Sequence, residues 1–185
     1  MKSRRYVVIA RLLGALLALA ILPGLAQAHG PTRQKVTETI EVAAPPAKVW
    51  ARIQEFNDMS WHPRVAETEG APGNVVDTAR LVTLKTGGEL AETLYRYDAA
   101  KMSYATLLPH VDVKVMPVTN YSAYLTVKPG KTPETSIVEY RCAFYRGDPN
   151  GDPPPELNEE AAIKAVTAFA KEGLEGIKKA VEQGS

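Results

Sequence analysis

The chain has 185 residues with 22 basic and 21 acidic side chains, a length and balance that suit one domain with a substantial core. This balance lacks the basic excess that is typical of proteins that bind nucleic acid or anionic lipid. Cys142 is the single cysteine, so an internal disulfide is excluded and stability must come from packing.

The N-terminal segment has the pattern of a secretory signal peptide. Four basic residues within positions 2–11 precede the run LLGALLALAILPGLA, which is too short and too interrupted to span a bilayer comfortably. Small residues then predict cleavage between Ala28 and His29. We expect residues 1–28 to be the signal peptide and residues 29–185 to form one periplasmic domain. Loss of the four basic residues takes the net charge from +1 to −3. We expect no membrane attachment after cleavage.

The first elements of the expected domain are a strand and a short helix. Residues 35–42 (KVTETIEV) alternate apolar and polar side chains with a period of two, which predicts a half-buried strand. After two prolines, which a first helical turn tolerates, Val49, Trp50 and Ile53 fall on one helical face. Pro63 then favours an extended conformation in the residue before it, where the chain re-enters a sheet.

Six further strands are predicted between short turns, as in an antiparallel meander. Their expected ranges are 65–69, 75–84, 89–97, 102–107, 120–127 and 136–145. Residues 108–118 contain two prolines and fit either the start of a strand or a loop over the rim of the sheet. In the last strand, Val138, Tyr140, Cys142 and Phe144 alternate with more polar side chains and are expected to face the core.

A long amphipathic helix is predicted at the C-terminus. Asn158 is a favourable N-cap, and an apolar stripe from Ile163 to Val181 predicts one buried face. Gly173 and Gly176 each cost about 1 kcal/mol of helix stability relative to alanine, which indicates a close approach to the sheet or to a cavity. The element order predicts an α+β fold in which a curved antiparallel sheet buries this stripe. Because one cylinder does not fill a strongly curved sheet, we expect a cavity between them.

The element order and three motifs resemble a known superfamily. The motifs are IEVAAPPAKVW (40–50), FND (56–58) and WHP (61–63). They are similar to those of the START-like helix-grip superfamily, also called SRPBCC, which includes polyketide cyclases and lipid-transfer domains. The resemblance implies a curved antiparallel sheet wrapped around a long C-terminal helix.

Four further motifs resemble a narrower family. AHGPTRQKV (28–36), LKTGGEL (84–90), VKVMPVTNY (113–121) and FYRGDPNGDPPPELN (144–158) are similar to the MxaD family of periplasmic proteins associated with bacterial methanol oxidation. The resemblance implies a non-enzymatic accessory role without a cofactor of its own. The implied partners are a methanol dehydrogenase that depends on pyrroloquinoline quinone (PQQ) and its cytochrome c acceptor, whose productive contact the protein would promote.

His62 admits an enzymatic, a ligand-contacting and a structural interpretation. Its imidazole titrates near neutral pH, and the acids Asp58 and Glu67 are near enough in sequence to orient it. No serine or cysteine nucleophile lies in a recognisable elbow, and the histidines lack metal-ligand spacing. We therefore expect a non-enzyme without a metal site, in which Trp61 anchors the helical segment and His62 lies at the mouth of the cavity.

A carrier of a small apolar or quinone-like ligand is the alternative function. Its site would be the cavity between sheet and helix, where tyrosines suit a wall that needs an apolar ring and one hydrogen bond. The candidate lining residues are Trp61, His62, Tyr95, Tyr104, Tyr124 and Tyr140. Cys142, on the inward face of its strand, is expected to be a buried, inert thiol.

The proline-rich segment 146–157 fits a spacer, a cover over one end of the cavity, or a surface that docks a partner. Rigid proline-rich loops lose little entropy on binding, and the family resemblance favours docking. The candidate docking residues are Arg146, Asp148, Asp152, Pro153, Pro154, Pro155 and Glu156. The acids among them suit a basic patch on the partner.

Overall fold

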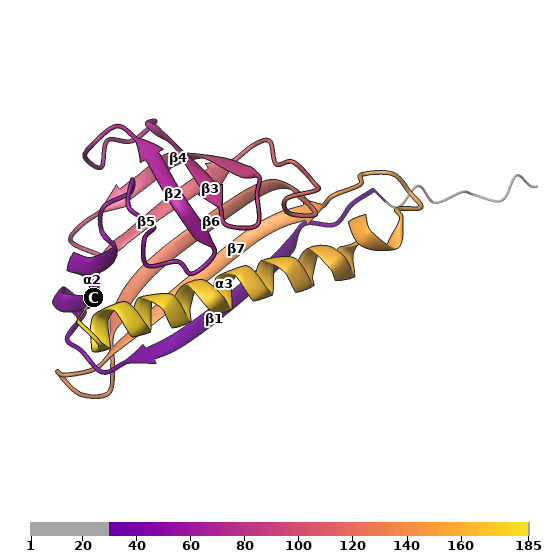
Figure 1. The fold of residues 1–185 in the computed structure, drawn as a ribbon. Helices are drawn as coiled ribbons and strands as arrows, with labels where there is room; N and C mark the ends of the chain where they lie inside the picture. The colour runs from indigo at the N-terminus through magenta and orange to yellow at the C-terminus, as the bar shows by residue number, and fades with distance from the viewer. Residues whose placement is uncertain (1–29, 185) are drawn as a thin grey trace, which may run out of the picture.

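A computed structural model describes residues 30–184 (Figure 1). The predicted signal peptide, residues 1–28, and the predicted cleavage site between Ala28 and His29 lie outside these residues. Within residues 30–184, no helix combines the length and the apolar character that crossing a membrane requires.

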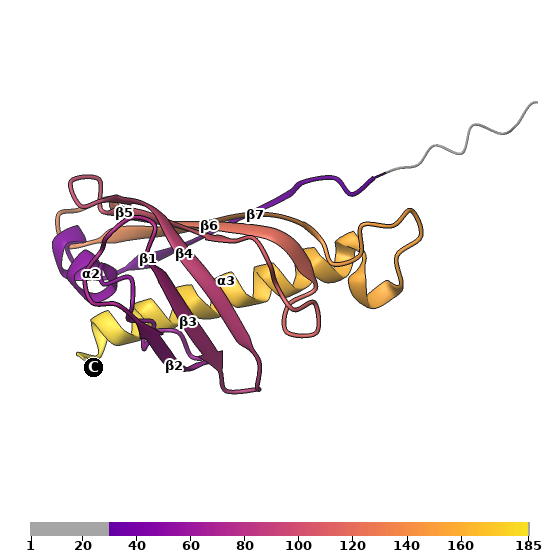
Figure 2. The ribbon, with the colours of Figure 1, turned by 90° about the horizontal axis from the view of Figure 1, so that it is seen from above.

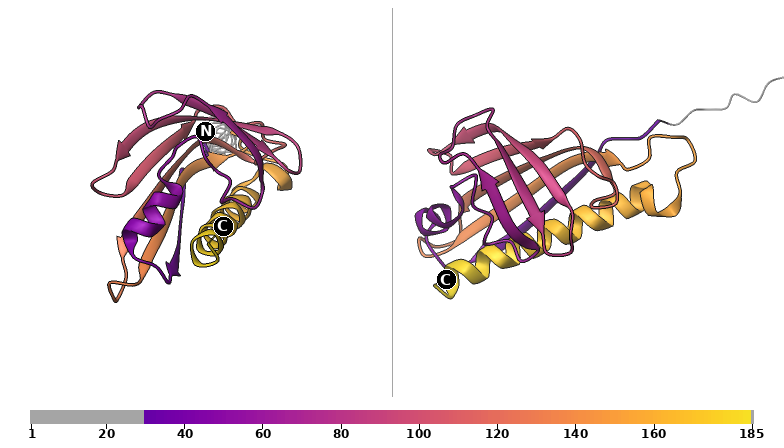
Figure 3. Two further views of the ribbon diagram at one scale, coloured as in Figure 1. Left: turned by 60° about the vertical axis from the view of Figure 1, so that its left-hand side comes forward. Right: turned by 45° about the horizontal axis from the view of Figure 1, so that its top comes forward.

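Seven strands form one antiparallel sheet beside one long helix. The strands are β1 (Gln34–Val42), β2 (Val65–Gly70), β3 (Ala79–Leu84), β4 (Glu89–Asp98), β5 (Ser103–Leu108), β6 (Val118–Pro129) and β7 (Ser136–Arg146). Their order in the sheet is β1-β7-β6-β5-β4-β3-β2. The sheet curves over α3 (Glu159–Glu182), which lies along its concave side (Figures 1 and 3). The predicted α+β helix-grip fold is confirmed.

The strand β7 faces the core as its alternation predicts. Val138, Tyr140, Cys142 and Phe144 are each at most 5% exposed. They point toward α3, whereas the intervening residues face the outer side of the sheet. This facing fixes the inner and outer sides of the neighbouring strands, because β7 pairs without a register shift along β1 and along β6 from Ser122 onward.

Two segments between strands bear on the predictions. The first differs from its prediction, and the second decides between two predicted alternatives. The strand expected from position 75 begins at Ala79, because residues 75–78 form a turn in which the Thr78 hydroxyl donates to the Val75 carbonyl oxygen. Asp77 there has a φ of 70°, a left-handed conformation that a strand does not accommodate. Residues 109–117 form a loop, in which Asp112 accepts from the backbone of Lys114 through its side chain.

The short helix α2 (Pro46–Ile53) closes one end of the sheet. It buries Val49, Trp50 and Ile53, as predicted. The Trp50 ring lies 5.7 Å from the ring of Tyr97 and 6.3 Å from that of Tyr104, between centroids. Figure 2 shows α2 and the C-terminal end of α3 at the same end of the molecule.

The helix α3 begins at the predicted cap. The Asn158 side chain accepts from the Ala161 backbone N–H at 2.9 Å, and a single 3-10 turn, η1 (Pro155–Leu157), precedes it. The buried face differs from the predicted stripe at its start: Ile163 is 39% exposed and Ala162 is buried instead. With 3.6 residues per turn, Ala162 shares a face with Val166, and Ile163 is rotated about 100° away.

Candidate functional site

The segment Trp61–Pro63 packs directly against two glycines of α3. A Cβ atom at Gly176 would lie 2.0 Å from the Trp61 carbonyl oxygen, and one at Gly173 would lie 2.9 Å from His62 Cδ2. Both distances are shorter than non-bonded atoms tolerate, so the helix approaches this segment only because the two side chains are missing. The glycines were predicted to allow a close approach to the sheet or a cavity; the close approach is to Trp61–Pro63.

His62 is buried and has both ring nitrogens engaged. Its Nε2 lies 3.2 Å from the Phe169 carbonyl oxygen, and its Nδ1 lies 3.2 Å from the Arg64 backbone nitrogen. A carbonyl accepts and a backbone N–H donates, so the imidazole carries its proton on Nε2 and is neutral. Burial lowers the pKa of His62 to about 4, and the hydrogen bond to Phe169 only partly offsets this.

An ion pair covers this segment from the solvent side. Arg64 donates from Nε and Nη2 to the two carboxylate oxygens of Glu172, at 2.6 and 2.5 Å. This bidentate pair ties the residue after Pro63 to α3, so the loop and the helix are fastened on both sides of His62.

The interior contains a buried ion pair that the sequence analysis missed. Arg80 on β3 donates from Nε and Nη2 to Glu92 on β4, and both side chains are 3% exposed. Arg80 also donates from Nη1 to the Phe56 carbonyl oxygen, and its guanidinium carbon lies 4.4 Å from the centroid of the Phe56 ring. Burial opposes the charge of Arg80, but the Glu92 carboxylate outweighs it and raises the pKa of Arg80.

The alternation of inward- and outward-facing residues along β3 and β4 is the sequence signal that predicts this ion pair. Arg80 lies two residues before the inward-facing Val82, and Glu92 lies between the inward-facing Leu90 and Leu94. A charged residue at an inward position of each of two neighbouring strands indicates a pair, and the register places Arg80 opposite Glu92.

The predicted cavity is represented by a small void. It measures about 10 Å³, which is near the lower limit for one water molecule. Its lining residues are Trp61, Arg80, Tyr104, Thr106, Ala123, Leu125 and Tyr140. Three predicted cavity residues, Trp61, Tyr104 and Tyr140, therefore meet here, and burial raises the pKa of Tyr104 to about 12.

Tyr95 and Tyr124 lie elsewhere. They are half-buried on the outer side of the sheet, and their rings meet edge to face at 5.6 Å between centroids. Tyr95 follows the inward-facing Leu94, and Tyr124 precedes the inward-facing Leu125. Alternation therefore places both tyrosines on the opposite side of the sheet. Their assignment to the interior cavity is corrected. His62 packs against Phe169 and Gly173 of α3, is 1% exposed, and is not among the residues that line the void.

Cys142 has the environment that was predicted. It is 3% exposed, and its Sγ lies 3.1 Å from the Tyr121 hydroxyl. Burial raises the pKa of the Cys142 thiol to about 12, so the reactive thiolate is scarce at neutral pH.

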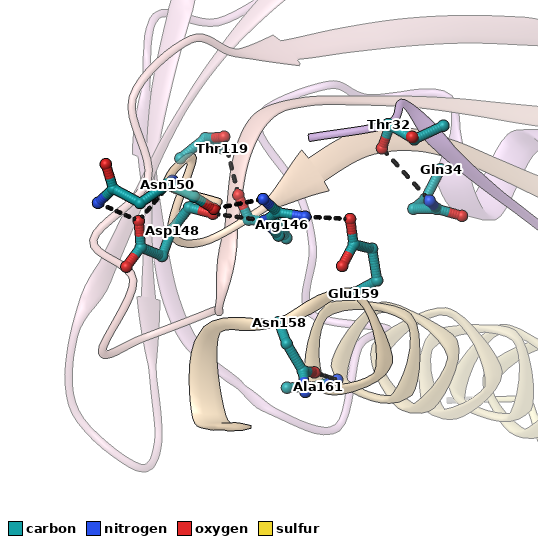
Figure 4. A network of polar contacts seen from close by, with 9 residues as sticks. All are labelled: Thr32, Gln34, Thr119, Arg146, Asp148, Asn150, Asn158, Glu159 and Ala161. Atoms are coloured by element: carbon teal, nitrogen blue, oxygen red, sulfur yellow. Dashed lines mark hydrogen bonds and ion pairs between the residues drawn. The ribbon is translucent and has the colours of Figure 1, made fainter. Parts of the chain in front are cut away.

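The proline-rich loop is organised by Arg146 (Figure 4). The Arg146 side chain is 6% exposed. Its guanidinium donates to the Asp148 carbonyl oxygen at 2.7 Å, to the Asn150 carbonyl oxygen at 2.5 Å and to the Glu159 carboxylate at 2.5 Å. Arg146 was predicted to be a docking residue. Because its guanidinium is buried and engaged, it positions the loop from within.

The exposed surface of the loop carries acidic side chains next to prolines. Asp152, Pro155 and Glu156 are exposed, whereas Asp148, Pro153 and Pro154 are half-buried. The Asp148 side chain accepts from the backbone and side-chain nitrogens of Asn150 at 2.8 and 2.7 Å. A backbone hydrogen bond from Asp148 to Leu157 closes the base of the loop. The loop thus has one internally bonded shape, with Asp152 and Glu156 as its accessible charges.

Comparison with protein-family models gives one match, over residues 33–182, to the polyketide cyclase/dehydrase and lipid transport family. This covers most of the chain. The chain belongs to that family. A search of curated proteins found no significant match.

Solved structures of similar fold include a START superfamily protein and an enzyme. The protein XoxI from Bacillus cereus is 25% identical, with a TM-score of 0.67 over 80% of this chain and 95% of the other. A START superfamily protein from Mycobacterium smegmatis is 15% identical, with a TM-score of 0.63 over 82% of this chain and 99% of the other. Norcoclaurine synthase from Thalictrum flavum, in complex with dopamine and hydroxybenzaldehyde, is 16% identical, with a TM-score of 0.63 over 88% of this chain and 94% of the other. The last two show likeness of fold alone.

Proposed function

We propose that this family member is a non-enzymatic periplasmic accessory protein of methanol oxidation. In this role it promotes productive contact between a PQQ-dependent methanol dehydrogenase and its cytochrome c acceptor. The observation that carries the proposal is the proline-rich loop, residues 146–157, an acidic surface of fixed shape that the buried Arg146 holds from within. The same loop lies within the longest of the sequence motifs that resemble the MxaD family.

The small size of the internal void favours a function performed at the surface of the protein over one performed in an internal cavity. The void measures about 10 Å³, far below the roughly 300 Å³ at which small-molecule sites begin. Within residues 30–184, every side-chain nitrogen and oxygen that is fully shielded from solvent has a hydrogen-bond partner. His62, for which an enzymatic interpretation was one of three, uses both ring nitrogens to hold α3 and its own loop.

The loop has the properties of a transient docking surface. Its hydrogen bonds are made before a partner arrives, so little conformational entropy is lost on binding. The exposed charges of Asp152 and Glu156 accelerate encounter with a basic patch and make it sensitive to salt. A small contact of about 1,200 Å² or less suits proteins that must separate again after each encounter.

The test is electron transfer from purified methanol dehydrogenase to its cytochrome c, measured with and without this protein across a salt series. The variant Asp152→Asn/Glu156→Gln should reduce the effect on the rate at low salt. A matched control, Glu67→Gln/Glu69→Gln, removes two exposed charges from β2 and should act like the unaltered protein. A protein that leaves the rate unchanged at every salt concentration contradicts the accessory role.

A loop replacement tests the surface as a whole. Residues 151–156 are replaced by a glycine–serine linker, while Arg146 and the cap residue Asn158 are kept so that α3 still begins correctly. Unchanged activity of this folded variant would show that the loop is a spacer.

A carrier of a small apolar or quinone-like molecule is the second candidate. The family description includes lipid transport, and the buried Arg80 and Tyr104 border the void between the sheet and Trp61. Native mass spectrometry of the protein purified from its own periplasm distinguishes the two. A bound molecule at one copy per chain supports the carrier, and a mass equal to that of the bare chain supports the docking protein.

A further inference from the structure

The outer side of the sheet carries two adjacent hollows that the proposed function does not use. One measures about 380 Å³ and is lined by Arg33, Thr93, Leu107, Pro109, Asn120, Tyr121, Ser122 and Tyr145. The other measures about 370 Å³ and is lined by Lys35, Thr37, Arg96, Tyr124, Arg141, Cys142 and Ala143. Both involve β1, β6 and β7 or the residues next to them, so they follow one another along the same strands.

The charged residues that line these hollows are all basic. Arg33, Lys35, Arg96 and Arg141 are exposed, and no acidic residue lines either hollow. Arg141 shares Glu139 with Lys128. Among residues 30–184, the other three basic side chains make no ion pair within 4.0 Å. We call Arg33, Lys35, Arg96 and Arg141, with Tyr95, Tyr124 and Tyr145, the basic sheet face.

The aromatic residues of the basic sheet face are held in a fixed arrangement. The guanidinium carbon of Arg141 lies 5.1 Å from the centroid of the Tyr124 ring, and the Tyr95 ring meets Tyr124 at an interplanar angle of 90°. Arg33 also donates to the Ser122 hydroxyl at 3.3 Å. Tyrosine and arginine are the side chains that protein interfaces enrich, because they combine contact area with hydrogen bonding.

We propose that the basic sheet face binds an extended acidic segment of another protein. The two hollows extend from Arg141 to Tyr145 along β7, a rise of about 14 Å, which matches about four residues of an extended peptide. Alternate carboxylates of such a segment reach Arg33 and Lys35 toward the Tyr145 end of this stretch of β7, and Arg96 and Arg141 toward its other end. This surface shares no residue with the acidic loop, and the inference does not depend on the methanol-oxidation role.

Two other anionic partners fit the basic sheet face less well. Bases of single-stranded nucleic acid bind by stacking on open aromatic faces, but Arg141 covers one face of Tyr124 and Tyr95 meets the ring edge to face. Attachment to anionic lipid needs a cluster of basic residues together with buried apolar area, and Leu107, at 40% exposed, is the one large exposed apolar side chain that lines the hollows.

The experiment measures binding of a fluorescein-labelled dodecapeptide of alternating glutamate and serine by fluorescence anisotropy at low ionic strength. The variant Arg33→Gln/Lys35→Gln/Arg96→Gln should bind it about tenfold more weakly, because three exposed charge contacts are lost. The matched control Lys48→Gln/Lys164→Gln/Lys179→Gln removes the same charge from exposed positions on α2 and α3 and should bind like the unaltered protein. Amide shifts in nuclear magnetic resonance spectra should map the peptide to β1, β6 and β7.

Defined outcomes overturn the proposal. It fails if both triple variants lose affinity equally, since binding then follows net charge and not the face. It also fails if oligothymidylate of the same charge, or vesicles of phosphatidylglycerol, bind more tightly than the peptide and displace it. Absence of peptide binding by the unaltered protein refutes it directly.

Discussion

The neutral, buried His62 makes the stability of the fold depend on pH in a calculable way. Its pKa is lowered from 6.5 to about 4, because burial penalises the imidazolium, with Arg64 and Arg80 adding to the penalty and Glu172 opposing it. A base whose pKa is depressed on folding binds protons more readily in the unfolded chain, so stability is highest above pH 6.5 and falls as the pH drops toward 4. The full shift corresponds to about 3 kcal/mol, and about 2 kcal/mol of it is lost between pH 7 and pH 5.

Urea denaturation at a series of pH values measures this loss. The interval from pH 7 to pH 5 isolates the histidine, because Asp58 and Glu172, whose pKa values are lowered below 3.8 and 4.5, are already ionised there in the folded state. His62→Asn should flatten the dependence, whereas His110→Asn, at an exposed position, should retain it. An imidazole of His62 that titrates near 6.5 in the folded protein, by nuclear magnetic resonance, would refute the reasoning.

Four further predictions concern stability. Arg80→Met should cost about 3–5 kcal/mol in urea denaturation because it leaves Glu92 buried without its partner, and Arg80→Met/Glu92→Leu should recover most of that loss. Gly176→Ala should destabilise by more than Gly173→Ala in the same assay, since its Cβ meets the rigid Trp61 backbone and not a side chain; equal costs would contradict the close approach. Trp61→Ala should cost about 3–5 kcal/mol by thermal or urea unfolding, given that Trp61 is 3% exposed. Arg146→Met should cost about 1–3 kcal/mol and should speed hydrogen exchange at the Asp148 amide, while amides of β2 stay unchanged.

Local patterns were sufficient to predict the fold and several facings. Alternation along β7 assigned Tyr140 and Cys142 to the interior, and Asn158 marked the start of α3, because these depend on residues close in sequence. The same rule applied to β4 and β6 places Tyr95 and Tyr124 outside. The prediction assigned Tyr95, Tyr104, Tyr124 and Tyr140 to the cavity together and did not apply the alternation of each strand to each tyrosine.

Features that depend on distances between elements were not accessible in the same way. The order of elements indicates a helix beneath a curved sheet, but it does not say how closely the two pack. The void near Tyr104 is small because Trp61 fills the space and α3 approaches it through Gly176, a contact between residues more than a hundred positions apart. The burial of Arg146 likewise depends on how the loop folds back to Asn150 and Glu159, which composition does not specify.

The glycines of α3 set the spacing of the whole interior. At position 176 there is no room for even a methyl group beside the Trp61 carbonyl oxygen. An alanine or serine there would require α3 and the Trp61 segment to move apart, and Trp61 lines the void. Capacity for a guest molecule in this architecture is therefore decided by two backbone positions on the helix as much as by the residues that line the pocket. Substitution of Gly173 and Gly176 is therefore a way to change the volume of the void without altering any residue that lines it.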